Sequence, residues 1–311
     1  GITLFDSIKD KHISNKKIKK SSIEKLYTTN KELFSNKGLD AITKTFNNEI
    51  VHYDKNSGKN FIKKNNLDTN DLYNYLNWDK STKTCIIFGH NLFDGNYYNS
   101  WRIFRDNLTW FKETLFFIKN LKPEINWLYK EHPSEYGSEF RNTTKSVKEF
   151  YDIIGSQDNI KIFPKNFNSI LLRDVADCAL TSQGSVGIEY PCFGIPVITA
   201  GDSFYDSLGF SYNPRNKDEY FDLITDMSKI ISKKLTKDEI NLARISFYFS
   251  NKATRIDHPL LTESDISRKI DLNLFFDQSI DLISKYKEDE DTFKKCLQIQ
   301  LANNDRNLTA I

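Results

Sequence analysis

The stretch CALTSQGSVGIEYPCFGIPVITAG, residues 178–201, decides the fold class. It opens with a short apolar run, Cys178–Thr181, and closes with another, Pro196–Thr199, and each run predicts a buried strand. A turn rich in Ser and Gly lies between them and leads into a short helix. A strand, a helix and a second strand in this order indicate a parallel α/β unit.

The same alternation extends toward the N-terminus. Further short apolar runs predict strands at Cys85–Phe88, Ile125–Tyr129 and Ile160–Phe163. Segments of helical length separate them, at Asn107–Asn120, Lys145–Ile154 and Asn168–Val175. The alternation predicts an α/β fold with a Rossmann-type, doubly wound parallel sheet over residues 81–215. Ligands of such sheets bind beyond the carboxyl ends of the strands.

The segments on either side of this sheet are expected to be mostly helical. Residues 1–80 are rich in Lys and Asn, and their strand candidates are Ile2–Phe5 and Glu49–Tyr53. This N-terminal segment has too few strand candidates for a second full Rossmann domain. It is therefore interpreted as a short, reduced or truncated N-terminal domain.

Residues 216–311 are interpreted as a helical C-terminal extension. Asp218–Ser232 carries apolar residues on one helical face. Thr236 and Glu239 have the spacing of a capping box before a helix at Ile240–Phe249. Asp265–Tyr286 is a third amphipathic stretch.

Composition narrows the classes of function. Of the 311 residues, 39% are hydrophobic and 28% are charged, which is typical of a globular protein with a hydrated surface. A net charge of +2 creates no field that draws nucleic acid, so no nucleic-acid partner is expected. Lysine clusters such as Lys16–Lys20 can contact an anionic membrane surface, which makes peripheral association an expectation.

The cysteines and the hydropathy indicate a compartment. Cys85, Cys178, Cys192 and Cys296 form no CxxC pair and no metal-like spacing, and the first three lie in or beside apolar runs. We interpret those three as small buried hydrophobes in a reducing environment. No signal peptide is recognisable and no apolar run is long enough to span a bilayer. A cytoplasmic location is therefore expected.

A first candidate loop, residues 88–95, follows the first strand of the predicted sheet. It brings His90, Asn91 and Asp94 together. If Asp94 points into the crevice, its carboxylate can act as a nucleophile or a base. A simple turn explains the same residue types through backbone preferences alone.

A second candidate loop, residues 130–135, follows the next strand. It contains Lys130, His132, Pro133 and Glu135. Histidine donates hydrogen bonds to phosphate oxygens, and the following proline stiffens the loop, so the loop suits an anion. The same dipeptide recurs at His258, and only the position after a strand separates the two.

The third candidate loop, residues 181–189, contains Ser182, Gln183, Gly184 and Ser185 and ends with Glu189. At a turn from strand to helix, backbone amides and hydroxyls can face a phosphate. Glu189, one turn into the helix, can accept from ribose hydroxyls. The loop lacks the Walker and GxGxxG patterns. A helix N-cap by Ser182 or Ser185 is the plain alternative.

Read together, these loops resemble the capsule polysaccharide biosynthesis family, which includes retaining β-Kdo transferases of capsule and lipopolysaccharide assembly. The matching pieces are FGHNLFDGNYY, WFKETLFFIKN, INWLYKEHPSE, TSQGSVGIEYPCFGIPVITAG and FYDSLGF, in family order over residues 83–215. The resemblance implies a GT-B architecture of two Rossmann-like domains, with the nucleotide held mainly by the C-terminal one. It also implies CMP-Kdo or a related acidic CMP-sugar as donor and a glycan or glycolipid as acceptor.

The resemblance also implies roles for individual residues. His132 would contact the donor phosphate, Ser182 and Ser185 would bind phosphate with nearby amides, and Glu189 would bind the ribose. Lys130, Pro133, Gln183 and Gly184 belong to the same binding loops.

The resemblance implies catalytic roles for residues of the first candidate loop, residues 88–95, and for Glu135. Asp94 would be the nucleophile of a double displacement that retains configuration. His90 and Glu135 would assist proton transfer or acceptor positioning. No metal and no other cofactor is expected, because His132, Ser hydroxyls and a helix dipole can stabilise the leaving phosphate.

Two features depart from the family pattern. Glu131 places a negative charge directly before His132, where the family more often has an uncharged residue. The N-terminal segment is also too short for a complete N-terminal Rossmann domain. Two alternatives remain open, a GT-B transferase with a UDP-sugar or CDP-glycerol-like donor, and a non-catalytic module that binds a nucleotide or glycan.

Overall fold

The computed structural model describes residues 2–3, 20–56, 67–92, 103–122, 124–132, 145–206, 208–253, 255–256, 280–281 and 283–285. The chain divides into two compact units, Ile13–Phe247 and the combination of Gly1–His12 with Tyr248–Ile311. Within the described residues, no helix has the length and apolar character that a membrane span requires. The five-stranded sheet lies in the larger unit.

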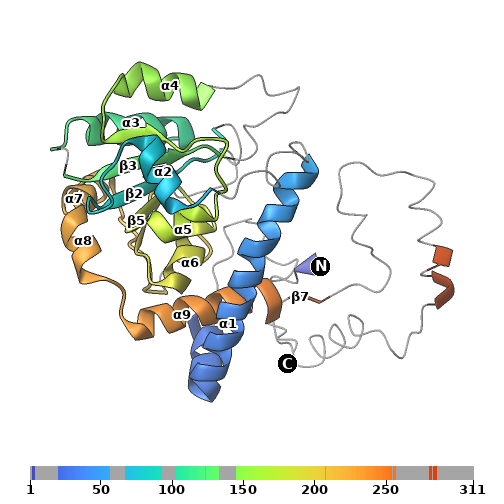
Figure 1. The fold of residues 1–311 in the computed structure, drawn as a ribbon. Helices are drawn as coiled ribbons and strands as arrows, with labels where there is room; N and C mark the ends of the chain where they lie inside the picture. The colour runs from blue at the N-terminus through green and yellow to red at the C-terminus, as the bar shows by residue number, and fades with distance from the viewer. Residues whose placement is uncertain are drawn as a thin grey trace. The chain divides into compact units, whose positions relative to one another are not determined.

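A five-stranded parallel sheet forms the centre of the larger unit (Figure 1). Its strands are β2 (Thr84–Phe88), β3 (Asn126–Lys130), β4 (Ile160–Ile162), β5 (Cys178–Thr181) and β6 (Val197–Thr199). Their order is β4-β3-β2-β5-β6, with all four pairings parallel. The chain winds outward from β2 to β4 and then returns to β5 and β6, so a topological switch point lies between β2 and β5. The predicted doubly wound α/β sheet is confirmed.

Successive strand residues point to opposite faces, and both faces are covered by helices. Cys85 and Ile87 join one core cluster, beneath α3 (Asn107–Lys119), α4 (Lys145–Ile154), α7 (Lys217–Thr225) and α8 (Met227–Lys233). Ile86 joins the opposite cluster, beneath α2 (Thr69–Leu76) and α5 (Leu171–Val175). Because both faces are buried, the strands are nearly continuous apolar runs, which is why they were recognisable in the sequence.

Helix α3 carries the apolar stripe that its sequence predicts. Its N-cap, Asp106, accepts a hydrogen bond from the Thr109 amide at 2.6 Å. The indole of Trp110 donates to the hydroxyl of Tyr220 on α7 at 2.9 Å. This bond links α3 to α7 within the core.

Helix α1 (Lys20–Asn56) includes a kink at Asn30, whose side chain accepts from the Leu33 amide at 3.0 Å. The prediction of a strand at Glu49–Tyr53 is wrong, because this segment continues α1. A short apolar run is a weak signal, and a helix that has already formed extends at one hydrogen bond per residue.

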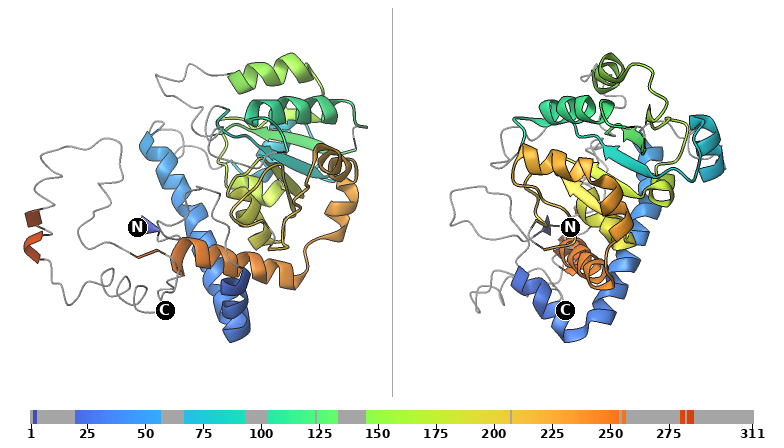
Figure 2. Two further views of the ribbon diagram at one scale, coloured as in Figure 1. Left: turned by 180° about the vertical axis from the view of Figure 1, so that it is seen from behind. Right: turned by 90° about the vertical axis from the view of Figure 1, so that its left-hand side faces the viewer.

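Helix α9 (Lys237–Tyr248) crosses α1 in the left view of Figure 2. Thr236 and Glu239 form the predicted capping box, with each side chain bonded to the other residue's backbone amide. Tyr27 and Lys31 of α1 both donate to Asp238 of α9. The part of this unit that the structure describes also contains α6 (Val186–Glu189) and the 3₁₀ turn η2 (Tyr190–Phe193).

The helix predicted at Asp218–Ser232 is divided into α7 and α8 at Asp226, whose φ and ψ of −87° and 17° interrupt the helical path. In the smaller unit, β1 (Ile2–Thr3) pairs antiparallel with β7 (Arg255–Ile256), and η3 spans Phe249–Ala253. The stretch Asp265–Tyr286 falls largely outside the described residues.

The predicted burial of three cysteines is confirmed. Cys85, Cys178 and Cys192 are fully buried free thiols, and Cys85 pairs in register with Cys178 on the neighbouring strand. Burial raises the pKa of the Cys85 and Cys192 thiols above the ordinary value of 9.0. These thiols therefore stay protonated and behave as small apolar side chains.

Candidate functional site

Three strands end at the same level at the carboxyl edge of the sheet. Phe88 of β2 is paired with Lys130 of β3 on one side and with Thr181 of β5 on the other. The Gly89 amide extends the ladder by donating to the Lys130 carbonyl at 2.8 Å. The three candidate loops therefore begin side by side, as expected from their positions after strands.

The loop after β2 contacts the loop after β5 through His90. The Gln183 amide donates to His90 Nε2 at 3.2 Å, and Thr181 Oγ1 lies 3.2 Å from the same nitrogen. Because Nε2 accepts the amide hydrogen, a neutral ring carries its own hydrogen on Nδ1. His90 therefore connects the loop after β2 to the loop after β5, across the switch point.

The loop after β3 brings His132 to the same place. Its ring lies nearly parallel to that of His90, with centroids 6.3 Å apart and 19° between the planes. Trp110 presents its ring at 84° to His90, with centroids 6.2 Å apart. Two imidazoles from different strands thus lie next to each other beside the buried end of α3.

The loop after β5 is held at Gly184 by two hydrogen bonds. The Gly184 amide donates to Thr181 Oγ1 at 3.1 Å, and the Gly184 carbonyl accepts from Tyr205 Oη at 2.6 Å. A Cβ at Gly184 would lie 2.8 Å from Thr181 Oγ1, and a Cβ at Gly187 would lie 2.0 Å from Tyr205 Oη. Both glycines therefore allow an approach that any other residue would block.

Tyr205 is a buried hydrogen-bond donor to the loop after β5. Burial raises the pKa of its phenol above the ordinary value of 10.0, and the charges of Asp206 and Glu189 raise it further. The phenol stays protonated, so it keeps donating to the Gly184 carbonyl.

The two serines of the loop are placed differently. Ser182 is buried, and its hydroxyl donates to Asn107 Oδ1 at 3.0 Å. Ser185 is exposed at the N-cap position of α6 without a side-chain capping bond. The plain alternative, in which one of these hydroxyls caps the helix, is not what the structure shows.

The charged residues beside His132 are buried. Lys130 is 8% exposed, and its amine donates to the Glu131 carbonyl at 2.9 Å. The Glu131 side chain is 2% exposed and lies 3.5 Å from the amine of Lys165. The negative charge that the sequence places before His132 therefore has a cation beside it.

The other predicted residues are either buried in α6 or not described. Glu189 lies in α6 and is buried. Asp94, Pro133 and Glu135 lie outside the described residues. Among the residues that are described, no three His, Cys, Asp or Glu side chains gather to hold a metal ion.

Sequence reasoning missed two residues of the cluster, Asn107 and Tyr205. Their partners are 75 and 21 positions away in the chain, so no local spacing reveals the contacts. The only sequence signal was that each lies within a piece that matches or borders the family resemblance.

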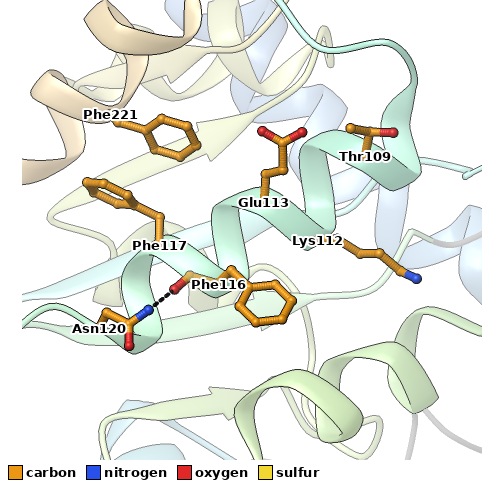
Figure 3. A pocket seen from close by; sticks show the side chains of 7 residues that line it. All are labelled: Thr109, Lys112, Glu113, Phe116, Phe117, Asn120 and Phe221. Atoms are coloured by element: carbon orange, nitrogen blue, oxygen red, sulfur yellow. Dashed lines mark hydrogen bonds between the residues drawn. The ribbon is translucent and has the colours of Figure 1, made fainter.

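A surface depression of about 570 Å³ lies elsewhere, along α3 (Figure 3). Phe117 of α3 stacks on Phe221 of α7 within it, at a centroid distance of 4.4 Å. None of its seven lining residues is a predicted site residue.

The sequence matches no protein-family model and no curated protein. Its fold is similar to that of solved structures at low identity. One is the S. aureus MnaA–UDP co-structure, at 14% identity and a TM-score of 0.39 over 57% of this chain and 45% of that one. Another is the beta Kdo 2,7 transferase of Thermosulfurimonas dismutans KpsC, at 14% identity and a TM-score of 0.34 over 78% of this chain and 61% of that one. A third is the wall teichoic acid polymerase TagF, at 13% identity and a TM-score of 0.38 over 70% of this chain and 48% of that one. The chain thus spans less than two thirds of each of these proteins.

Proposed function

We propose that this chain is the donor-binding part of a glycosyltransferase that assembles bacterial capsule or lipopolysaccharide. Its donor would be CMP-Kdo or a related CMP-activated acidic sugar, within a GT-B architecture. One observation carries the proposal: His90, His132 and the loop after β5 converge at the switch point of a doubly wound sheet. Nucleotides bind at this place in such sheets.

The chemistry of these groups suits a phosphate monoester. A CMP leaving group accumulates negative charge on its phosphate, and imidazole N–H groups, a hydroxyl and backbone amides all donate to such oxygens. His132 would donate to the phosphate, and the loop after β5 would surround it. Because the leaving group is a good one, anion stabilisation without a metal suffices in this proposal.

The proposed reaction proceeds in two displacements at the anomeric carbon. The Asp94 carboxylate attacks this carbon, the bond from carbon to phosphate oxygen breaks, and CMP departs with the electron pair. An acceptor hydroxyl on a glycan or glycolipid then replaces Asp94, passing its proton to a base such as His90 or Glu135. Two inversions retain the configuration. The role of Asp94 follows from the family resemblance of its loop.

The first test measures which nucleotide binds. We expect isothermal titration calorimetry to show CMP binding in the presence of excess EDTA, with UMP binding more weakly. Replacing His132 with Ala should raise the Kd for CMP by about tenfold or more, because a hydrogen bond to a charged group is lost. The matched control is His258→Ala, the other histidine that precedes a proline, which should leave the Kd unchanged.

Preference for UMP would assign the site to a uridine-activated donor. Equal affinity of His132→Ala and the unmodified protein would remove His132 from the donor site. If neither CMP nor UMP binds to the unmodified protein, the proposed function is wrong.

The second test looks for the covalent intermediate. Incubation with CMP-Kdo should release CMP and add the mass of one Kdo residue to the intact protein, and Asp94→Ala should abolish the added mass while still binding CMP. Activity should persist in excess EDTA. Binding of CMP without release or adduct would favour the non-catalytic module, and activity restored only by Mg²⁺ or Mn²⁺ would refute metal independence.

A further inference from the structure

The side chain of Asn107 connects the two loops that border the switch point. Asn107 is the first residue of α3 and is 3% exposed. Its Oδ1 accepts from Ser182 Oγ at 3.0 Å, and its Nδ2 donates to the Asn91 carbonyl at 3.2 Å. Asn91 follows β2 and Ser182 follows β5, so a single amide group bonds to the loops after both strands.

The bond to Asn107 determines what the hydroxyl of Ser182 can do. A serine hydroxyl has one hydrogen, and Ser182 directs it to an oxygen that can only accept. The oxygens of a phosphate dianion are also acceptors. While the bond to Asn107 is present, Ser182 therefore has no hydrogen to donate to a phosphate.

The hydroxyl of Ser185, in contrast to that of Ser182, is available to donate. Ser185 is exposed, and its hydroxyl makes no hydrogen bond within the described part of the chain. The Ser185 hydroxyl therefore has a hydrogen that it can donate to an anion.

We propose that Asn107 is a positioning residue of the donor site and that Ser185, not Ser182, donates its hydroxyl to the phosphate. This inference rests on the function proposed above. Asn107 holds the start of the β5 loop against the β2 loop, which places Ser185. Only an amide side chain supplies both the acceptor for Ser182 and the donor for Asn91.

The test combines CMP affinity with hydrogen–deuterium exchange of the peptide that spans residues 182–186. Ser185→Ala should raise the Kd for CMP roughly three- to tenfold and leave exchange in the ligand-free protein unchanged. Asn107→Ala and Ser182→Ala should each accelerate exchange and raise the Kd. The double variant should be no worse than the poorer single variant, because both remove one shared bond.

The chain offers a matched control in a second buried Ser–Asn pair. Ser35 Oγ donates to Asn241 Oδ1 at 2.8 Å, between α1 and α9. Asn241→Ala should lower stability comparably but leave the Kd and the exchange of residues 182–186 unchanged. If Asn107→Ala does not fold, Asn107→Asp replaces it, since a carboxylate still accepts from Ser182 but cannot donate to the Asn91 carbonyl.

Three results would overturn the inference. They are a larger loss of CMP affinity in Ser182→Ala than in Ser185→Ala, additive losses in the double variant, and unchanged exchange in the Asn107 variants. If the unmodified protein binds no CMP, the proposed function fails together with the role of Ser185. The exchange measurements then still decide whether Asn107 positions the loop.

Discussion

At the residue scale, Tyr205 controls the path of the loop after β5. Its hydroxyl donates to the Gly184 carbonyl at 2.6 Å, and its ring is fully buried. Tyr205→Phe should lower the free energy of unfolding by about 1–2 kcal/mol, because one buried hydrogen bond is lost. It should also weaken CMP binding severalfold, because the loop loses a support. Urea denaturation and calorimetry measure the two effects.

Tyr220 provides the comparison for this variant. Its hydroxyl is equally buried, but its hydrogen bonds within the described structure go to Trp110 and Thr114 of α3 and not to a candidate loop. Tyr220→Phe should lower stability by a similar amount and leave CMP affinity unchanged. Equal effects of the two variants on CMP affinity would show that Tyr205 acts only through global stability.

At the element scale, α2 depends on a charged N-cap. The Asp68 carboxylate accepts from the Asp71 and Asn70 amides, and the Asp71 side chain accepts in return from the Asp68 amide. These bonds, chiefly the one from the Asp71 amide, hold the pKa of Asp68 below its ordinary value of 3.8. The charged form is therefore favoured in the folded protein.

The sign of the pH dependence follows from this lowered pKa. Because the unfolded chain binds the proton more readily, the stabilisation is complete above pH 3.8 and is lost as the pH falls through the lower folded value. The unmodified protein should thus be more stable than Asp68→Asn at pH 7, with the difference shrinking below pH 3.8. Denaturant titrations from pH 7 to pH 2 measure it, and a difference independent of pH would contradict the role of the charge.

The elements that sequence patterns predicted best are the buried strands and α4. A strand covered on both faces must be apolar throughout, so Cys178–Thr181 was recognisable from its residues alone. The break at Asp226 was not, because the apolar residues of α7 and α8 keep one helical spacing across it. Periodicity reports which face is buried and says little about where the backbone turns.

At the scale of the whole molecule, the sequence predicted that the three candidate loops would open at one edge of the sheet, but not which of them would be neighbours. His90 and the serine loop are neighbours because β5 pairs with β2, and this pairing skips β3 and β4. Strand order depends on the packing of helices on both faces, which no local pattern encodes. The positions of Asn107 and Tyr205 depend on that packing, so their contacts became visible only in the structure.

The bond between Trp110 and Tyr220 has a consequence for how the sheet can be divided experimentally. Helices α7 and α8, which follow β6 in the chain, pack on the core of the sheet through Tyr220, Ile224 and Met227. Tyr220 also accepts a hydrogen bond from Trp110 of α3, the helix that begins at Asn107. A fragment cut at residue 215 would expose this apolar surface to water and leave the Trp110 N–H without its acceptor. The smallest piece that preserves the sheet and its three candidate loops must therefore keep α7 and α8, although these helices follow the loops in the chain.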